Sequence, residues 1–208
     1  MKNSYKNLNL INGSREDDVF DINEPVVPDS FVKLGRGNDS FSVNTGNHII
    51  KAGRGDDIVL SGDGDDDIYG GRGDDHINGG DGDDDIKGGR DDDYLLGGNG
   101  DDILKGGRGN DVIRGGSGED ELYGGRGHDT FVHVAGDNVT EVFDFKKGED
   151  LIKLDFDGVE NLGQVLDIAQ DVVIEDNRIE VVVDDNNTLI VHGLGSEDVP
   201  DLADYFIF

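Results

Sequence analysis

The sequence predicts an all-β fold in which short parallel strands stack into a column, followed by a small, mostly-β cap. Three observations lead to this prediction: a repeat of nine residues, one large apolar residue in each repeat, and glycines concentrated in its first half. One apolar residue in nine fits no helical period, but it fits a three-residue strand whose middle side chain points inward. A repeat of this length is typical of a parallel stack with two short strands in each coil.

Nine consecutive units occupy residues 52–132, and two weaker units precede them, LGRGNDSFS from Leu34 and VNTGNHIIK from Val43. Of the 34 glycines, 27 lie between Leu34 and Val132, mostly at positions one, two and four of the units. Glycine there suits tight turns with positive φ angles that expose carbonyl groups to a ligand. The eighth position is always apolar: Phe41, Ile50, Val59, Ile68, Ile77, Ile86, Leu95, Leu104, Ile113, Leu122 and Phe131.

The chain is strongly acidic, with 48 acidic and 18 basic residues among 208 and a formal net charge of -30. Such a chain repels itself open unless a cation binds it, which excludes nucleic acid as a partner and indicates multivalent metal ions. It has no cysteine, so neither a disulfide framework nor a thiolate metal site is expected. No apolar run is long enough for an N-terminal signal peptide or a membrane span.

The sixth position of the repeat supplies the candidate metal ligands. Carboxylate and carbonyl oxygens are hard ligands that select calcium over transition metals. In stacked coils these carboxylates would lie roughly 5 Å apart, the spacing of neighbouring strands, and would repel each other without a cation between them. Binding and folding are therefore expected to be one event. The column reads Asp39, His48, Asp57, Asp66, Asp75, Asp84, Asp93, Asp102, Asp111, Asp120 and Asp129.

Other interpretations of the repeats are a disordered acidic linker or a flexible Gly-Asp spacer. The regular apolar column favours the folded stack over both. An EF-hand fits less well: Asp81, Asp83 and Asp85 have loop-like spacing, but no glycine follows Asp85 to make the sharp turn.

The units resemble the GGxGxDxUx repeats of the RTX (repeats-in-toxin, hemolysin-type) calcium-binding family, where U is a large apolar residue, and are similar to the modules of alginate epimerases and serralysin-type proteases. The resemblance implies a parallel β-roll in which two units form one coil and about seven or eight Ca²⁺ ions lie between successive turns. Each ion would contact two aspartates eighteen residues apart, from Asp57 with Asp75 to Asp111 with Asp129. Asp39 belongs to the same column.

The resemblance also implies backbone carbonyl ligands. These would come from Gly53, Gly55, Gly62, Gly64, Gly71, Gly73, Gly80, Gly82, Gly98, Gly100, Gly107 and Gly109. Two units depart from the family pattern. His48 replaces an aspartate, and Asp91 replaces a fourth-position glycine, which is expected to distort that turn.

A second period of eighteen residues runs through the repeats. The third position is arginine in every other unit, at Arg36, Arg54, Arg72, Arg90, Arg108 and Arg126. The ninth position carries Lys51, Tyr69, Lys87, Lys105 and Tyr123, which are expected on the outer face of one sheet. The arginines either balance neighbouring acids such as Asp56, Asp74 and Asp92, which is the favoured interpretation, or bind an acidic polysaccharide such as a polyuronate.

The two ends differ from the repeats and divide the chain into residues 1–33, a degenerate N-terminal cap, residues 34–132, the roll, and residues 133–208, a C-terminal cap and secretion-signal region. NGSREDDVF from Asn12 reads as a decayed unit, with Asp17 in the ligand column and Val19 in the apolar column. Near the C-terminus, Ile152, Leu154 and Phe156 alternate as a strand, residues 161–170 are compatible with a helix, and residues 179–191 predict a hairpin.

VTEVFDFKKGEDLIKLD and the final residues 204–208 resemble the C-terminal target regions of type I secretion substrates, which implies a bacterial exporter that reads an uncleaved signal. No HExxH, GxSxG or thiol nucleophile is present, so an enzyme is not expected. The sequence therefore predicts a secreted, extracellular module that folds on binding several calcium ions. The alternatives are a polysaccharide-binding module accessory to an extracellular enzyme, and a surface or biofilm structural protein.

Overall fold

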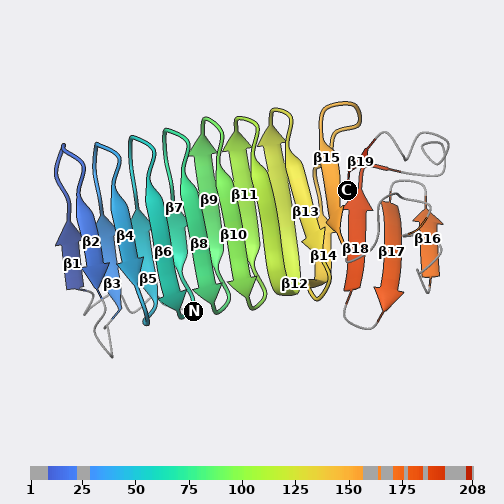
Figure 1. The fold of residues 1–208 in the computed structure, drawn as a ribbon, viewed down its shortest axis with the longest axis horizontal. Coiled ribbons are helices and arrows are strands. Elements are labelled where there is room, and N and C mark those ends of the chain that lie inside the picture. Colours follow the sequence, from blue (N-terminus) through green and yellow to red (C-terminus); the bar gives the residue numbers. More distant parts are fainter. Residues whose placement is uncertain are drawn as a thin grey trace.

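The computed structural model describes residues 9–22, 29–156, 164, 171–175, 178–184, 187–194 and 205–207. It confirms the all-β fold, a parallel β-roll extended along one axis with a small mostly-β cap at its C-terminal end (Figure 1). The strands are β1 (Asn9–Asn12), β2 (Val19–Ile22), β3 (Ser30–Lys33), β4 (Ser40–Val43), β5 (His48–Lys51), β6 (Ile58–Asp63), β7 (Asp67–Tyr69), β8 (His76–Asp81), β9 (Asp85–Arg90), β10 (Tyr94–Asn99), β11 (Ile103–Arg108), β12 (Val112–Arg126), β13 (Thr130–Val134), β14 (Asn138–Val142), β15 (Leu151–Asp155), β16 (Asp171–Glu175), β17 (Arg178–Asp184), β18 (Asn187–His192) and β19 (Phe206–Ile207).

Successive strands of the roll alternate between two parallel sheets. Sheet A contains β1, β3, β5, β7, β9, β11, the second half of β12, β14 and β18, and it continues beyond β18 with the antiparallel strands β17 and β16. Sheet B contains β2, β4, β6, β8, β10, the first half of β12, β13, β15 and β19. Within the repeats, paired residues are eighteen apart, as are Ile68, Ile86 and Leu104, so the predicted two units per coil are confirmed.

The core is a single file of apolar side chains between the sheets. All eleven eighth-position residues from Phe41 to Phe131 are at most 2% exposed. Glycine is required where the turns stack: a Cβ on Gly71, whose φ is 124°, would lie 2.4 Å from the Gly53 carbonyl oxygen of the previous coil. Asp91 takes the left-handed conformation with φ 75°, and its neighbours β9 and β11 keep their register, so the expected distortion does not reach the strands.

The N-terminal unit is shifted by one residue from its prediction. Phe20, rather than Val19, pairs with Phe41 in the apolar column, and Val19 is 78% exposed. Asp18, rather than Asp17, donates its N–H to Asp39 and so lies in the ligand column. The Asp-x-apolar spacing fits Asp17 with Val19 and Asp18 with Phe20 equally well. The physical reason for the second arrangement is that it packs a ring against the core and leaves the smaller valine outside.

Beyond Val132 the chain extends both sheets. The predicted strand around Ile152 is β15, and the predicted hairpin is the antiparallel pair β17–β18, which pairs Ile179 with Val191. The helix predicted for residues 161–170 lies outside the described residues apart from Gln164. The described part of the chain contains no helix long and apolar enough to cross a membrane.

Candidate metal centre

The sixth-position residues form two rows, one along each edge of the roll. In each row a backbone N–H donates to the carboxylate Oδ1 one coil later, as Asp57 does to Asp75 (2.9 Å) and Asp66 to Asp84 (2.8 Å). The first carboxylate row contains Asp18, Asp39, Asp57, Asp75, Asp93, Asp111, Asp129 and Asp150. The second carboxylate row begins with His48 and continues with Asp66, Asp84, Asp102 and Asp120.

The second oxygen of most of these carboxylates has no hydrogen-bond partner among the described residues. A buried acceptor left unpaired costs about 1–3 kcal/mol, and more when it is charged. A cation beside each oxygen would remove this cost. The buried, unpaired Oδ2 atoms belong to Asp39, Asp57, Asp66, Asp75, Asp84, Asp93, Asp102, Asp111, Asp120 and Asp129.

The first-position glycines keep open the space next to these oxygens. A Cβ on Gly79 would lie 2.0 Å from Asp84 Oδ2 and 2.8 Å from the carbonyl oxygen of Gly97, one coil later. A carboxylate oxygen and a carbonyl oxygen therefore face the same small space, which only an absent side chain leaves free. Calcium prefers this set of oxygen ligands. The residues present fit a calcium ion.

Sequence reasoning missed part of this arrangement. It named carbonyls at positions two and four and did not name the first-position carbonyls of Gly97 and Gly115, which border the spaces beside Gly79 and Gly97. It also missed Asp18 and Asp150, although each precedes an apolar core residue by two positions, as in every repeat. No group of three or more His, Cys, Asp or Glu side chains that could hold a metal occurs within the described residues.

Burial raises the pKa of the sixth-position aspartates from Asp39 to Asp129 and of Asp150. The pKa is about 6 for Asp57 and about 8 for Asp93, with burial the largest cause and neighbouring carboxylates adding to it. The backbone N–H bond to each carboxylate opposes the shift but does not cancel it. The pKa is about 7 for Asp66, Asp75, Asp84, Asp102, Asp111 and Asp120. Without bound cations, burial therefore disfavours the ionised form of these aspartates at neutral pH.

The first carboxylate row ends beside a lysine. Lys146 Nζ donates to the carbonyl oxygen of Gly125, and Asp150 accepts the backbone N–H groups of Asp129 (3.0 Å) and Lys146 (2.8 Å). Burial raises the pKa of Asp129, and the positive charge of Lys146 opposes that rise. The chain thus supplies its own cation at the last turn of this row.

The third-position arginines form a column along the edge of the first carboxylate row. Equivalent backbone bonds from Arg36 to Ser14 and from Arg54 to Gly35 place Arg15 at the head of the column, which sequence reasoning missed because the spacing there is 21 residues. None of the seven arginine side chains forms an ion pair with a described carboxylate. A hollow of about 500 Å³ at the head of the column is lined by Arg15, Lys33, Arg36 and Arg54.

The ninth-position residues lie on the outer face of sheet A. The Lys87 ammonium is 4.8 Å from the centre of the Tyr69 ring, and Lys51 is 5.4 Å from the same ring on its other side. Lys105 stands over Tyr123 in the same way. Cation–π contacts therefore link neighbouring coils on this face.

Residues 34–68, 60–95 and 96–131 match the family model described as RTX calcium-binding nonapeptide repeat (4 copies). Solved structures similar to the chain include the solution structure of a subunit of the Azotobacter vinelandii mannuronan C5-epimerase, 27% identical over 61% of this chain and 78% of that one, with a TM-score of 0.45. They also include the crystal structure of an extracellular lipase from Serratia marcescens, 15% identical over 87% of this chain and 38% of that one, with a TM-score of 0.39. No curated protein matches the chain.

Proposed function

Because the chain carries RTX calcium-binding nonapeptide repeats over residues 34–131, we propose that it is a secreted module that folds outside the cell when several calcium ions bind. The observation that carries this proposal is the ten buried carboxylate oxygens without a partner. A sequence that folded without cations would have no reason to bury so many charged acceptors in two lines. The proposed role is that of a binding module rather than an enzyme.

The ligands are the sixth-position aspartates, together with glycine carbonyls of the adjoining turns. Each ion lies between two aspartates of one row. Among the aspartates with an unpaired oxygen there are five such gaps from Asp39 to Asp129 and three from Asp66 to Asp120, which makes eight. Bound calcium supplies positive charge between carboxylates that otherwise repel each other, while the aspartates and carbonyls hold it in place.

Calcium affinity also determines where the chain folds. Extracellular calcium modules bind with dissociation constants of about 10⁻⁴ to 10⁻³ M, which keeps such a site empty in the cytosol. The chain then reaches a type I exporter unfolded, guided by an uncleaved C-terminal signal that includes residues 204–208, and folds in the calcium outside. Removal of residues 204–208 is expected to abolish export in a host with such an exporter; unchanged export would contradict this step.

Circular dichroism with and without calcium tests the folding proposal. The β signal should appear cooperatively as calcium rises through about 10⁻⁴ to 10⁻³ M and should disappear in EGTA. Magnesium is the control, because it dehydrates reluctantly and needs near-octahedral geometry, so it should not substitute at equal concentration. Equal structure in EGTA and in calcium would overturn the proposal.

A second candidate function is the binding of an acidic polysaccharide along the arginine column. It is favoured by the seven guanidinium groups without a described carboxylate partner and by the hollow at Arg15, Lys33, Arg36 and Arg54. Arginine binds carboxylates through two parallel hydrogen bonds, and a polyuronate repeats its carboxylates along its length. Calorimetric titration with uronate oligomers in calcium tests it, and no binding at about millimolar sugar would exclude it.

A further inference from the structure

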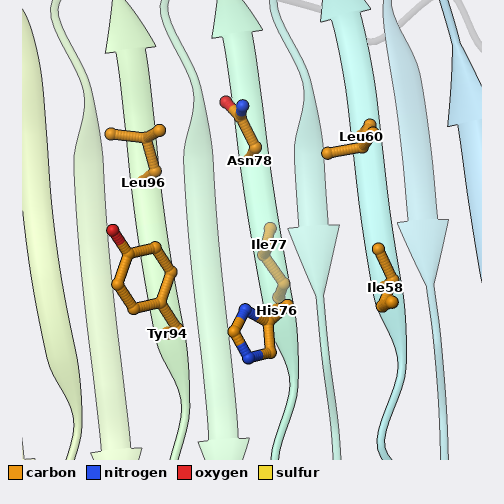
Figure 2. A pocket seen from close by; sticks show the side chains of 7 residues that line it. All are labelled: Ile58, Leu60, His76, Ile77, Asn78, Tyr94 and Leu96. Atoms are coloured by element: carbon orange, nitrogen blue, oxygen red, sulfur yellow. The ribbon is translucent and has the colours of Figure 1, made fainter.

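The outer face of sheet B differs from the rest of this acidic surface. In the first half of strands β6, β8 and β10 its outward side chains are apolar, amide or aromatic, and none of them is a carboxylate. Figure 2 shows these side chains side by side on the three strands. They are Ile58, Leu60, His76, Asn78, Tyr94 and Leu96, called here the sheet B groove.

The sheet B groove is a hollow of about 320 Å³ that runs along β8. Ile58 and Leu60 form one wall and Tyr94 and Leu96 the other, with His76 and Asn78 between them (Figure 2). Ile58, Leu60 and Tyr94 are 48%, 43% and 42% exposed, which leaves much apolar surface in water. The volume is within the range of sites that bind small ligands or single side chains, about 300–1,000 Å³.

The groove is rigid and carries polar groups. Each of its three strands is paired on both sides, and the rings of His76 and Tyr94 stack at 5.4 Å. Asn78 lies in the floor, where its amide can donate to and accept from a peptide backbone. Binding would therefore cost little ordering of the protein.

The two ends of the groove carry different charge. At one end β6 finishes on Asp63 and β8 on Asp81, in register with each other and three residues beyond Leu60 and Asn78. At the opposite end, Asp74 follows Arg72 in the turn before β8, so the charge there is mixed. The third strand, β10, ends on the neutral Asn99, whose side-chain amide donates to Asp81 Oδ1 (2.6 Å). The apolar groove therefore opens at this end onto a rim whose charged residues, Asp63 and Asp81, are acidic.

We propose that the sheet B groove binds an extended peptide segment that has an apolar anchor and a Lys or Arg about three residues away. The anchor lies between Leu60 and Leu96, and the basic residue reaches Asp63 and Asp81. The separation follows from the rise of about 3.3 Å per residue in extended chains. The charge requirement follows from the acidic rim of a chain with net charge -30.

The dimensions of the groove disfavour a second copy of the chain as occupant. Three strands and three residues cover on the order of 150 Å² by strand spacing. A stable protein dimer uses about 800 Å² on each partner. A single extended chain fits a groove bounded by two strands that lie about 10 Å apart. The proposal requires the folded roll, so it holds only in calcium if the proposed function is right.

Fluorescence anisotropy in saturating calcium tests the proposal with the labelled peptide Ser-Leu-Trp-Leu-Ser-Gly-Lys-Lys. The expected dissociation constant is about 10–100 µM. Leu60→Ser and Leu96→Ser should each weaken binding about five- to tenfold, because each removes apolar contact area. Asp81→Asn, or the same peptide with glutamates in place of its lysines, should weaken it by a similar factor or more.

Ile103→Ser is the matched control, since Ile103 is an outward apolar residue on sheet A. It should leave peptide binding unchanged, and circular dichroism in calcium should show every variant folded. Equal losses from Ile103→Ser and Leu96→Ser, or equal binding of the lysine and glutamate peptides, would overturn the proposal. Light scattering that shows a dimer abolished by Leu96→Ser would overturn it in favour of a second copy. Normal calcium-dependent folding without peptide binding would reject the groove and leave the folding proposal intact.

Discussion

The repeats (residues 34–132) and the C-terminal extension (the described residues after Val132) share the same two sheets, but their buried carboxylates are balanced differently. In the repeats, buried carboxylates have one oxygen bonded to the backbone and one without a partner. In the extension, buried Asp137 receives two hydrogen bonds from Arg114, at 2.7 and 3.2 Å, and Asp150 accepts two backbone N–H groups. Groups of the protein therefore balance these two carboxylates of the extension, Arg114 of the repeats among them, whereas we expect the repeat carboxylates to need cations from solution.

The hydrophobic cores of the repeats and of the extension also differ. Each unit from Ser61 to Val132 buries one aliphatic or aromatic side chain, whereas the extension joins Phe145 to Phe131 and Tyr205 in a cluster of rings, with centroids 6.4 and 6.0 Å apart. Burying a large apolar side chain contributes about 1.5–3 kcal/mol. One such side chain in nine residues cannot offset the conformational entropy of ordering nine residues, about 1–2 kcal/mol each for the backbone alone. We therefore expect the repeats to need the binding energy of ions, and the extension to need less of it.

The largest effect expected from this difference is a proton-driven gain of structure without calcium. Row aspartates have a pKa of about 7 in the roll, raised mainly by burial, against 3.8 in an unfolded chain. Because the folded pKa is the higher one, the roll binds protons on folding. Its stability is fully present below about pH 4 and is lost as the pH rises through about 7.

Circular dichroism in EGTA between about pH 5 and pH 8 measures this effect, with the lower limit set above the isoelectric point near 4.1. More β structure is expected at pH 5 than at pH 8, and little change is expected in saturating calcium. An EGTA sample equally unfolded at both pH values would show that carboxylate charge is not what holds the repeats open.

A substitution in the middle of a carboxylate row tests whether a row aspartate contributes more to stability than an outward-facing aspartate does. Asp93→Asn removes a charge shared by two successive gaps, so both positions weaken, and the expected loss is about 3 kcal/mol in calcium. Asp85→Asn is the control, because Asp85 points outward on sheet A and pairs with Lys87. It should change the unfolding free energy by less than about 0.5 kcal/mol. Denaturant unfolding at fixed calcium measures both, and similar losses would contradict the special role of the rows.

Much of the roll could be predicted from sequence because its period repeats one physical solution. The eighth-position side chains and the sixth-position aspartates recur every nine residues, so their columns are visible without coordinates. The N-terminal unit could not be placed as reliably, because its spacing to the next coil is 21 residues. Val19 and Phe20 are both apolar there, and only packing against Phe41 distinguishes them.

The details of the rows were less accessible from sequence. The repeat pattern locates an aspartate, but it does not say which of its oxygens the backbone occupies or which glycine carbonyl faces the other one. Asp150 and Lys146 lie outside the period, and their place at the end of the first row depends on how the turn at Lys147 folds back. Long-range packing of this kind leaves no periodic signal.

Two Gly→Ala substitutions, one in the repeats and one in the extension, separate the loss of space for a ligand from the cost of backbone strain. Gly97→Ala would place a Cβ 2.2 Å from Asp102 Oδ2, so it should close one candidate site and cost about 2–4 kcal/mol in calcium. Gly136→Ala meets no atom within 4 Å, and its positive φ of 95° alone should cost about 1–2 kcal/mol. The calcium midpoint of folding should rise much more for Gly97→Ala than for Gly136→Ala, because only Gly97 borders a candidate site, whereas Gly136→Ala acts through the stability of the fold alone. A shift of equal size in both would mean that the glycines serve only the backbone.

The smallest loss of stability is expected for a substitution at Lys146, where the repeats meet the extension. Lys146→Met keeps the length of the side chain but removes the ammonium beside Gly125 and Asp129, so the last turn of the first row loses the cation that opposes the raised pKa of Asp129. The expected loss is about 1–2 kcal/mol, because the group is partly buried and interacts with a carboxylate whose pKa it lowers. Lys153→Met is the control, since its exposed pair with Asp155 should contribute less than about 0.5 kcal/mol.

Because Lys146 acts without calcium, the loss of stability on Lys146→Met should be as large in EGTA at about pH 5 as in calcium at the same pH. A loss seen only in calcium would place Lys146 among the groups that support ion binding rather than replace it.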